Sequence, residues 1–262
     1  MSTLTLALRD SNTMLRRNLL HMRRYPSLTL MLIGIPVILL LLFVYVFGGT
    51  LGAGLGPSGD RADYANYVTP GILLITVASA AQGTAISVAM DMAEGIIARF
   101  RTMAIFRPSV LTGHVVGSVL QTMLSLAAVT GVALLVGFRP TANAVEWLAA
   151  VGVLVMITFA VTWLSVALGL VSKSVETASN LPMPLVLLPF LGSGFVPTDS
   201  MPTPIRLFAD YQPFTPVMET LRGLLFGTGI GVNGLLAVAW CAVITVVCFL
   251  WARARYNRGR AA

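Results

Sequence analysis

The run LTLMLIGIPVILLLLFVYVF, residues 28–47, decides the class of fold, because it carries no charged side chain. A helix rising 1.5 Å per residue over this length reaches across the roughly 30 Å hydrocarbon core of a bilayer. Four similar runs follow, at Val68–Met90, Val115–Phe138, Trp147–Val171 and Gly231–Trp251. The sequence therefore predicts an all-α integral membrane protein.

The composition supports lipid as the main solvent of this chain. Of its 262 residues, 56% are hydrophobic and only 10% are charged, whereas a soluble domain carries roughly 25% charged residues. The net charge of +7 comes almost entirely from arginines beside the apolar runs, as topology signals do. A nucleic-acid partner would need these residues clustered on one exposed face, so none is expected.

A sixth apolar run, Asn180–Val196, is shorter than the others and contains Pro182, Pro184 and Pro189. Each proline removes a helix hydrogen bond, so we interpret the run as a kinked or broken fifth span. The alternative is a re-entrant segment, which would place the C-terminus on the opposite side of the membrane.

Six spans place both termini on one side of the membrane, and the charge pattern identifies that side. It carries Arg9, Arg16, Arg17, Arg23, Arg24, Arg99, Arg101, Arg107, Lys173, Arg253, Arg255, Arg258 and Arg260. The opposite side carries Arg61, Arg139, Arg206 and Arg222. The positive-inside rule therefore predicts cytoplasmic termini.

Segments outside the spans also have predicted structure. Residues 1–27 are interpreted as a cytoplasmic interfacial helix, with leucines toward lipid and Arg9, Arg16 and Arg23 on another face. Residues 28–252 form the six-span bundle and residues 253–262 a cytoplasmic tail. Between spans five and six, Arg206 with Asp210 and Glu219 with Arg222 have helical spacing, which predicts two short helices on or dipping into the outer leaflet.

The sequence contains no recognisable ATP-hydrolysis motif and no catalytic motif. A P-loop needs Gly directly before its Lys, but Ser172 precedes Lys173, the only lysine. No grouping has the spacing of a metal site or a nucleophile motif, so an enzyme is not expected. The carboxylates Asp91, Glu94, Glu146 and Glu176 fall at span ends rather than at the membrane depth that an ion-coupled carrier uses. His114, also at a span boundary, is interpreted as a structural hydrogen-bonding residue rather than a proton relay.

The loop DMAEGIIARFRTMAIFRPSVLTG, residues 91–113, places acids first and arginines later, with apolar residues between them. Such a surface either docks a partner protein or faces lipid headgroups.

At this loop the chain resembles ABC-2-type permeases of the daunorubicin-resistance kind. The matching residues are Asp91, Gly95-Ile96-Ile97, Arg99-Phe100-Arg101, Val110-Leu111 and Gly113, and after the fifth run Phe195-Val196-Pro197, Met201-Pro202, Phe208-Ala209, Gln212-Pro213, Thr215-Pro216 and Leu221-Arg222. Met103-Ala104 stands where the family usually has Leu-Pro, which leaves the shape of the loop open.

The resemblance implies an exporter subunit in a bacterial plasma membrane. Two permeases, identical or related, would pair and bind two ABC ATPase subunits, which hold the ATP and Mg; this chain itself would bind no cofactor. The implied ATPase-coupling residues are Asp91, Glu94, Gly95, Ile96, Arg99, Phe100, Arg101 and Arg107. The implied extracellular re-entrant cap contains Phe195, Pro197, Met201, Pro202, Pro213, Thr215, Pro216 and Arg222.

Polar and aromatic residues within the spans are candidates for a translocation path, namely Gln82, Gln121, Phe159, Thr162 and Trp163. The alternative is ordinary helix–helix packing, in which small and hydroxyl residues are common. A path with few charges favours an amphiphilic cargo, such as an aromatic drug or a lipid. A self-sufficient ion-coupled carrier and a non-transporting membrane scaffold are the competing functions.

Overall fold

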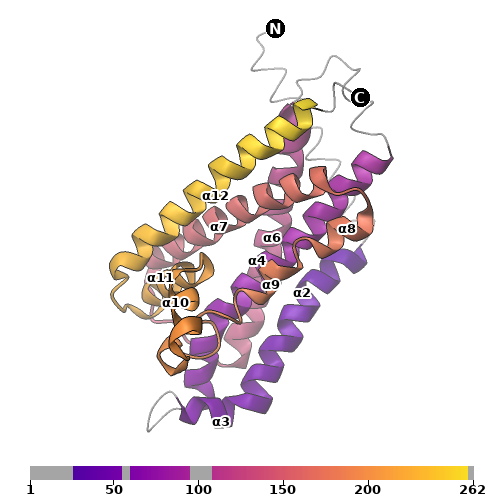
Figure 1. Cartoon of the computed structure of the whole chain (residues 1–262). Helices are drawn as coiled ribbons and strands as arrows, with labels where there is room; N and C mark the ends of the chain where they lie inside the picture. The colour runs from indigo at the N-terminus through magenta and orange to yellow at the C-terminus, as the bar shows by residue number, and fades with distance from the viewer. Residues whose placement is uncertain (1–25, 55–59, 95–107, 259–262) are drawn as a thin grey trace.

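The computed structural model describes residues 26–54, 60–94 and 108–258, and every regular element in this part of the chain is helical. Five of its helices are long and apolar enough to cross a membrane, at Leu30–Ala53, Arg61–Ala93, Thr112–Val136, Ala144–Val171 and Gly231–Tyr256. They pack side by side into one elongated bundle (Figure 1). The prediction of an all-α membrane fold is confirmed for these residues.

The long helices carry the following labels and bounds. They are α2 (Pro26–Leu41), which continues through a π-helical turn (Leu42–Phe47) into α3 (Gly48–Ala53), then α4 (Arg61–Ala93), α6 (Pro108–Val136), α7 (Ala144–Val171) and α12 (Gly231–Arg258). Helix α4 begins earlier than the predicted run at Val68, and α12 continues into the predicted tail as far as Arg258. The interfacial helix predicted over residues 1–27 lies almost wholly outside the described residues.

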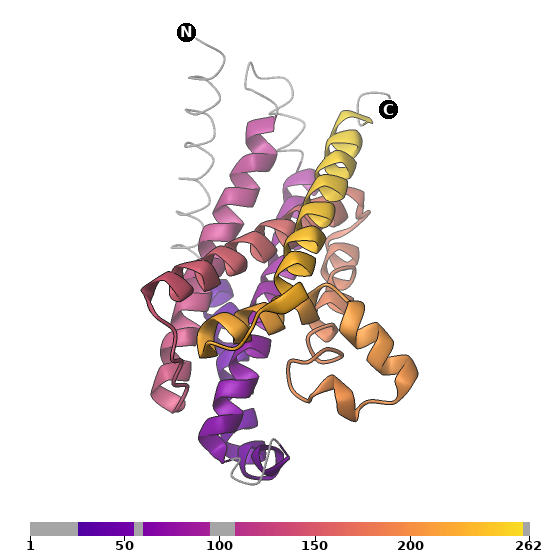
Figure 2. The same cartoon turned by 90° about the vertical axis from the view of Figure 1, so that its left-hand side faces the viewer.

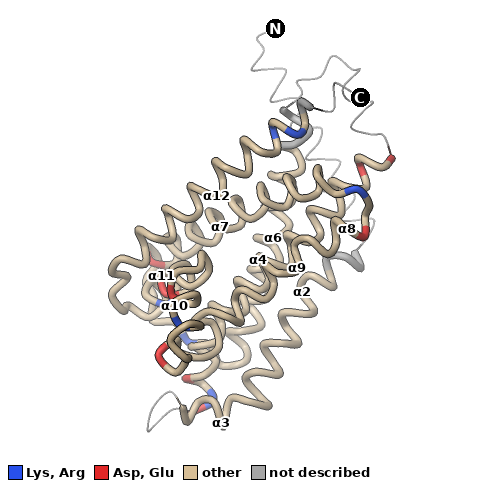
Figure 3. Tube along the Cα trace, in the orientation of Figure 1, with Lys and Arg blue, Asp and Glu red and all other residues tan. Residues whose placement is uncertain are grey.

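Charged residues gather at the two ends of the bundle and leave an uncharged band between them (Figure 3). We call the end where α4, α7 and α12 finish and α6 starts the loop end, and the opposite end the cap end. Two long helices begin at the cap end with capping boxes. Asp60 accepts hydrogen bonds from the backbone of Ala62 and Asp63, and Asn143 does the same for Val145 and Glu146. These boxes satisfy donors that lipid could not.

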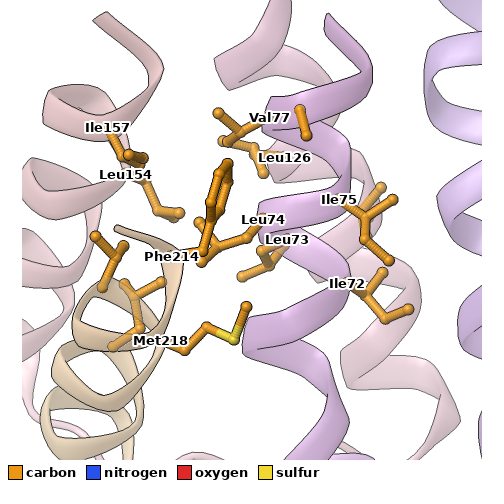
Figure 4. Packing of buried hydrophobic residues seen from close by; sticks show 14 of the residues in the cluster. Ile72, Leu73, Leu74, Ile75, Val77, Leu126, Leu154, Ile157, Phe214 and Met218 are labelled. Carbon is orange, nitrogen blue, oxygen red and sulfur yellow. The ribbon is translucent and has the colours of Figure 1, made fainter. Parts of the chain in front are cut away.

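Helix α4 forms the centre of the bundle. Its residues Ile72–Val77 are buried. Leu73 and Leu74 lie toward Leu154 of α7 and toward Phe214 and Met218 of α11, whereas Ile72 and Ile75 lie on the opposite face of the helix (Figure 4). Small residues bring α4 and α7 close together. A Cβ on Gly169 would lie 2.7 Å from the carbonyl oxygen of Ala85, so only glycine fits there.

The predicted fifth span is not a single kinked helix. Within the predicted run Asn180–Val196, α9 (Met183–Leu187) is followed by a series of turns that ends near Val196, and α8 (Val175–Asn180) precedes the run. The prolines explain the break, because Pro182, Pro184 and Pro189 lack the amide hydrogen that a continuous helix needs. We call residues 172–196 the broken segment.

The broken segment runs antiparallel to α4. Near the loop end, Gln82 Nε2 donates to the carbonyl oxygen of Ser179 at 2.9 Å. Farther along, Gly71 faces Gly194, whose carbonyl oxygen would lie 2.8 Å from a Cβ at position 71. Gln82 and Gly71 are eleven positions apart on α4, so the segment covers about 16 Å of the bundle's depth between these two points.

The chain then forms a 3₁₀ turn (Thr198–Ser200), α10 (Thr203–Tyr211) and α11 (Phe214–Phe226). The helical conformation predicted for these two pieces is therefore confirmed, whereas their place at the outer leaflet stays a prediction. Helix α10 and its preceding turn stand off the side of the bundle (Figure 2), with only Ala209 buried. Helix α11 packs against α4, α7 and α12. Its apolar positions Phe214, Val217, Met218, Leu221 and Leu225 recur at helical spacing and face the core.

Candidate functional site

A buried polar pair joins α4 and α6 at the loop end. His114 Nε2 lies 2.9 Å from Asp91 Oδ2, and their side chains are only 7% and 10% exposed. Asp91 stands near the end of α4 and His114 in the first turns of α6, so the pair brackets residues 95–107. We call Asp91 and His114 the neck of the loop.

The neck fixes the relative position of the two helices that carry the loop. A carboxylate shielded from water is costly unless a partner satisfies it, so separating Asp91 from His114 is unfavourable. This contact agrees with the interpretation of His114 as a structural hydrogen-bonding residue. The contact therefore ties the end of α4 to the start of α6.

Of the predicted ATPase-coupling residues, Asp91 and Glu94 are described. Glu94 is exposed and follows the end of α4, where its backbone amide donates to the carbonyl of Met90 at 2.9 Å. Gly95, Ile96, Arg99, Phe100, Arg101 and Arg107 lie outside the described residues. Their role in coupling stays a prediction.

The loop end presents further charges from the start of the broken segment. Lys173 and Glu176 are exposed there, and Ser174 caps α8 by accepting a hydrogen bond from the Thr177 amide at 3.2 Å. The hydrogen bonds from the Ser174 hydroxyl and from its own backbone amide lower the pKa of Glu176 below its ordinary value. The negative charge of Glu176 therefore stands in the first turn of α8, where it interacts favourably with the positive end of the helix dipole.

The predicted cap residues divide into two groups. Pro197 and Pro202 are exposed and Met201 is partly exposed, in the turns that lead to α10. Thr215, Pro216 and Phe195 are buried, and Pro213 and Arg222 are partly buried, around the first turns of α11 and the end of the broken segment. Pro213 and Pro216 fit the start of α11 because the first turn of a helix leaves its amides unpaired.

Gln212 connects the broken segment to α11. Its Nε2 donates to the carbonyl oxygen of Leu188 at 3.1 Å and to Thr215 Oγ1 at 3.0 Å. Gly192 lies so close to both side chains that a Cβ there would overlap them. One side chain thus satisfies a backbone carbonyl in the irregular segment, a condition for non-helical backbone at membrane depth.

Arg222 of α11 contacts three parts of the structure. Its guanidinium donates to Glu219 Oε1 at 2.5 Å, to the carbonyl oxygen of Tyr67 at 3.3 Å and to that of Ser193 at 3.0 Å. The guanidinium carbon also lies 4.1 Å from the centre of the Tyr67 ring. Arg222 therefore joins α11 to α4 and to the end of the broken segment.

Aromatic rings surround the end of the broken segment. The ring centre of Phe195 lies 4.5 Å from that of Phe43 in the π-helical turn and 4.6 Å from that of Phe190, on which it stacks. The Tyr64 hydroxyl lies 3.4 Å from the Phe195 carbonyl oxygen. These contacts hold the end of the broken segment against the π-helical turn and α4.

The candidate path residues do not all meet. Phe159 and Trp163 lie one turn apart on α7, and the Trp163 ring contacts Phe249 of α12 with ring centres 5.0 Å apart. Gln82 instead bonds Ser179, and the Thr162 hydroxyl donates to Thr158 of its own helix at 2.6 Å. Gln121 is partly exposed on α6. The Thr162 bond is the kind that helix packing alone explains.

Sequence reasoning did not identify three residues that complete the cap. Tyr67 and Ser193 contribute backbone carbonyls, which the residue type does not reveal. Gln212 stands within the matching family motif. Its polar side chain between apolar neighbours was the feature of the sequence that could have indicated a structural hydrogen bond.

The fold and these two sites define a polytopic membrane protein with an anchored loop at one end and a packed cap at the other. The chain matches the ABC-2 type transporter family over residues 10–226 and belongs to that family. It is 30% identical over 218 residues to the daunorubicin resistance ABC transporter permease protein DrrB1 of Streptomyces coeruleorubidus, covering 82% of this chain and 75% of the relative. It is 23% identical over 223 residues to the probable doxorubicin resistance ABC transporter permease protein DrrC of Mycobacterium tuberculosis, covering 85% and 80%.

Proposed function

We propose that this chain is the permease subunit of an ATP-driven exporter of amphiphilic compounds, such as aromatic drugs or lipids. The observation that carries the proposal is the family match over most of the chain, which contains no ATPase motif of its own. Two copies, or this chain and a related permease, would pair and bind two ABC ATPase subunits that hydrolyse ATP with Mg. The names of the relatives support a drug-like cargo.

The loop of residues 91–113 would receive the force of ATP hydrolysis. The neck supports this role, because the Asp91–His114 contact ties the end of α4 to the start of α6, the two helices between which the loop runs. The predicted docking residues Phe100 and Gly95 stand within this loop. Motion of the ATPase would then tilt the central helix α4, which packs against most of the bundle.

We further propose six crossings with both termini in the cytoplasm of a bacterial inner membrane. The antiparallel course of the broken segment beside α4 supports the fifth crossing. The basic residues Lys173, Arg253 and Arg255 at the loop end support its cytoplasmic placement. In this arrangement α10 and α11 form the re-entrant cap on the outer side.

Thiol labelling tests the fifth crossing, by the broken segment. In a chain whose Cys241 and Cys248 are replaced by alanine, Lys173→Cys should react with an impermeant maleimide only from the cytoplasmic side and Arg206→Cys only from outside. Reaction of both from the same side would show that the broken segment does not cross.

Co-purification tests the export function. The chain solubilised from its native membrane should retain a P-loop ATPase, and Phe100→Asp or Gly95→Pro should separate ATP hydrolysis from transport. Ala254→Asp is the matched control, since it adds an acid at an exposed site near the same end of the bundle. Purification of the chain without any ATPase, or coupled transport in both loop variants, would contradict the proposal.

An ion-coupled carrier is the competing function. It needs an ionisable group that is exposed to a path within the membrane. Among the described residues, the carboxylates lie toward the ends of the bundle, and the buried one, Asp91, is held by His114. Flux driven by a proton gradient in liposomes without ATP, lost in Asp91→Asn, would favour the carrier.

A further inference from the structure

We propose that Arg222 is the latch that holds the outer exit closed. Its guanidinium ties α11 to α4 and to the end of the broken segment, and the exit opens when these bonds are released. The inference rests on the proposed export function, in which α11 belongs to the outer cap. We call Arg222, Glu219, Tyr67 and Ser193 the latch cluster.

The latch spans elements that are distant in the sequence. Tyr67 and Arg222 are 155 residues apart, and Ser193 and Arg222 are 29 apart, yet one guanidinium reaches both carbonyls. A rigid planar fork with several donors holds such a geometry, whereas a lysine ammonium does not. Movement of α11 away from both α4 and the broken segment must therefore break both bonds and the contact with the Tyr67 ring.

The latch cluster tolerates burial because its charges are balanced. The Arg222 side chain is only 16% exposed, and Glu219, one turn earlier on the same helix, neutralises it. Because both charges travel with α11, opening separates no ion pair. Only the bonds to neutral carbonyls and the ring contact are lost, so the closed state is held firmly yet reversibly.

Two polar atoms of the cluster suit a contact that must open. Among the described residues, Arg222 Nε and Ser193 Oγ are buried and find no hydrogen-bond partner. Unsatisfied buried groups raise the free energy of the closed state, and water would hydrate them on opening. A fully satisfied network would be harder to open during each transport cycle.

Arg206 of α10 is a cap arginine whose ion pairs do not join the cap to the rest of the bundle. It pairs with Asp199 and Asp210, all within the cap, and its side chain is 47% exposed. It therefore reaches neither α4 nor the broken segment through these pairs. Arg206→Gln is the matched control for Arg222→Gln.

The accessibility of position 193 reports the state of the latch. Ser193 is 4% exposed and its hydroxyl has no partner among the described residues, so Ser193→Cys should fold with little loss of contacts. In the complete complex in liposomes without ATP, we expect this thiol to react slowly with an impermeant maleimide. Adding Arg222→Gln should raise the labelling rate at least about tenfold, since charge-assisted bonds are lost. Arg206→Gln should leave the rate unchanged.

The effect of ATP on the labelling rate distinguishes a latch that opens during transport from a contact that never opens. With Arg222 present, labelling of Ser193→Cys should accelerate during ATP turnover, and Arg222→Gln should make it independent of ATP. Arg222→Lys and Tyr67→Leu provide milder variants if Arg222→Gln fails to fold, and both should raise the rate without ATP. Equal rates with and without Arg222, or no response to ATP in a complex that hydrolyses it, would overturn the latch. Absence of an ATPase partner would instead refute the export function.

Discussion

Replacing Gly71 by alanine tests the contact that seats the broken segment against α4. An ideal Cβ at position 71 would lie 2.8 Å from the carbonyl oxygen of Gly194, 3.0 Å from its Cα and 3.1 Å from its carbonyl carbon. All three atoms belong to the backbone, so no side chain can rotate away to make room. The segment must shift as a whole or α4 must move.

The expected change in the free energy of unfolding of Gly71→Ala follows from two opposing effects. Forcing a methyl group into a packed interior costs about 1–3 kcal/mol. Alanine in a helix is better than glycine by roughly 0.5–1 kcal/mol, which offsets part of that loss. The free energy of unfolding should therefore fall by about 1–2 kcal/mol in Gly71→Ala.

Gly83 provides the control on the same helix. No described atom lies within 4 Å of the Cβ that alanine would add there. Gly83→Ala should then raise the free energy of unfolding by roughly 0.5–1 kcal/mol through helix propensity alone. Unfolding of both purified variants by SDS in mixed micelles measures the difference. Equal or greater stability of Gly71→Ala relative to Gly83→Ala would refute the close approach of the two backbones.

Two further predictions concern the neck and a helix start. Asp91→Asn and His114→Asn should each lower the ratio of transport to ATP hydrolysis, and their effects on unfolding should be non-additive by about 1–2 kcal/mol in a double-mutant cycle; additive effects would show that the two side chains do not interact. Asn143→Ala removes the side-chain acceptor at 2.9 Å and 3.0 Å from the amides of Val145 and Glu146, and should cost about 1 kcal/mol in the same SDS assay. An unchanged midpoint would mean that water or lipid headgroups replace the cap.

The long helices could be predicted from the sequence because their cause is local. An uncharged run of sufficient length forms its backbone hydrogen bonds within itself, so residues 28–47 and the four similar runs all appear as helices. The pairs Arg206–Asp210 and Glu219–Arg222 were predicted from helical spacing, and both are confirmed as ion pairs.

The candidate path was harder to predict, since residue type alone does not say which way a side chain in a membrane helix faces. Core and lipid are both apolar, so the spans lack the polar stripe that marks the outer face of a soluble helix. The Trp163 side chain faces Phe249 of α12, whereas the Gln82 side chain faces the broken segment. The identity of the neighbouring helix decided each case.

The sequence by itself determined that this chain is a membrane protein of the ABC-2 type, where its five long apolar helices lie and that its own residues contain no P-loop. Only the tertiary structure decided that α11 lies in the core, that Gly71 faces Gly194, and that Arg222 reaches Tyr67 and Ser193. The physical reason is the range of the interactions. Helices and their caps form between residues three or four apart, whereas the cap and the latch depend on backbone groups brought together by packing.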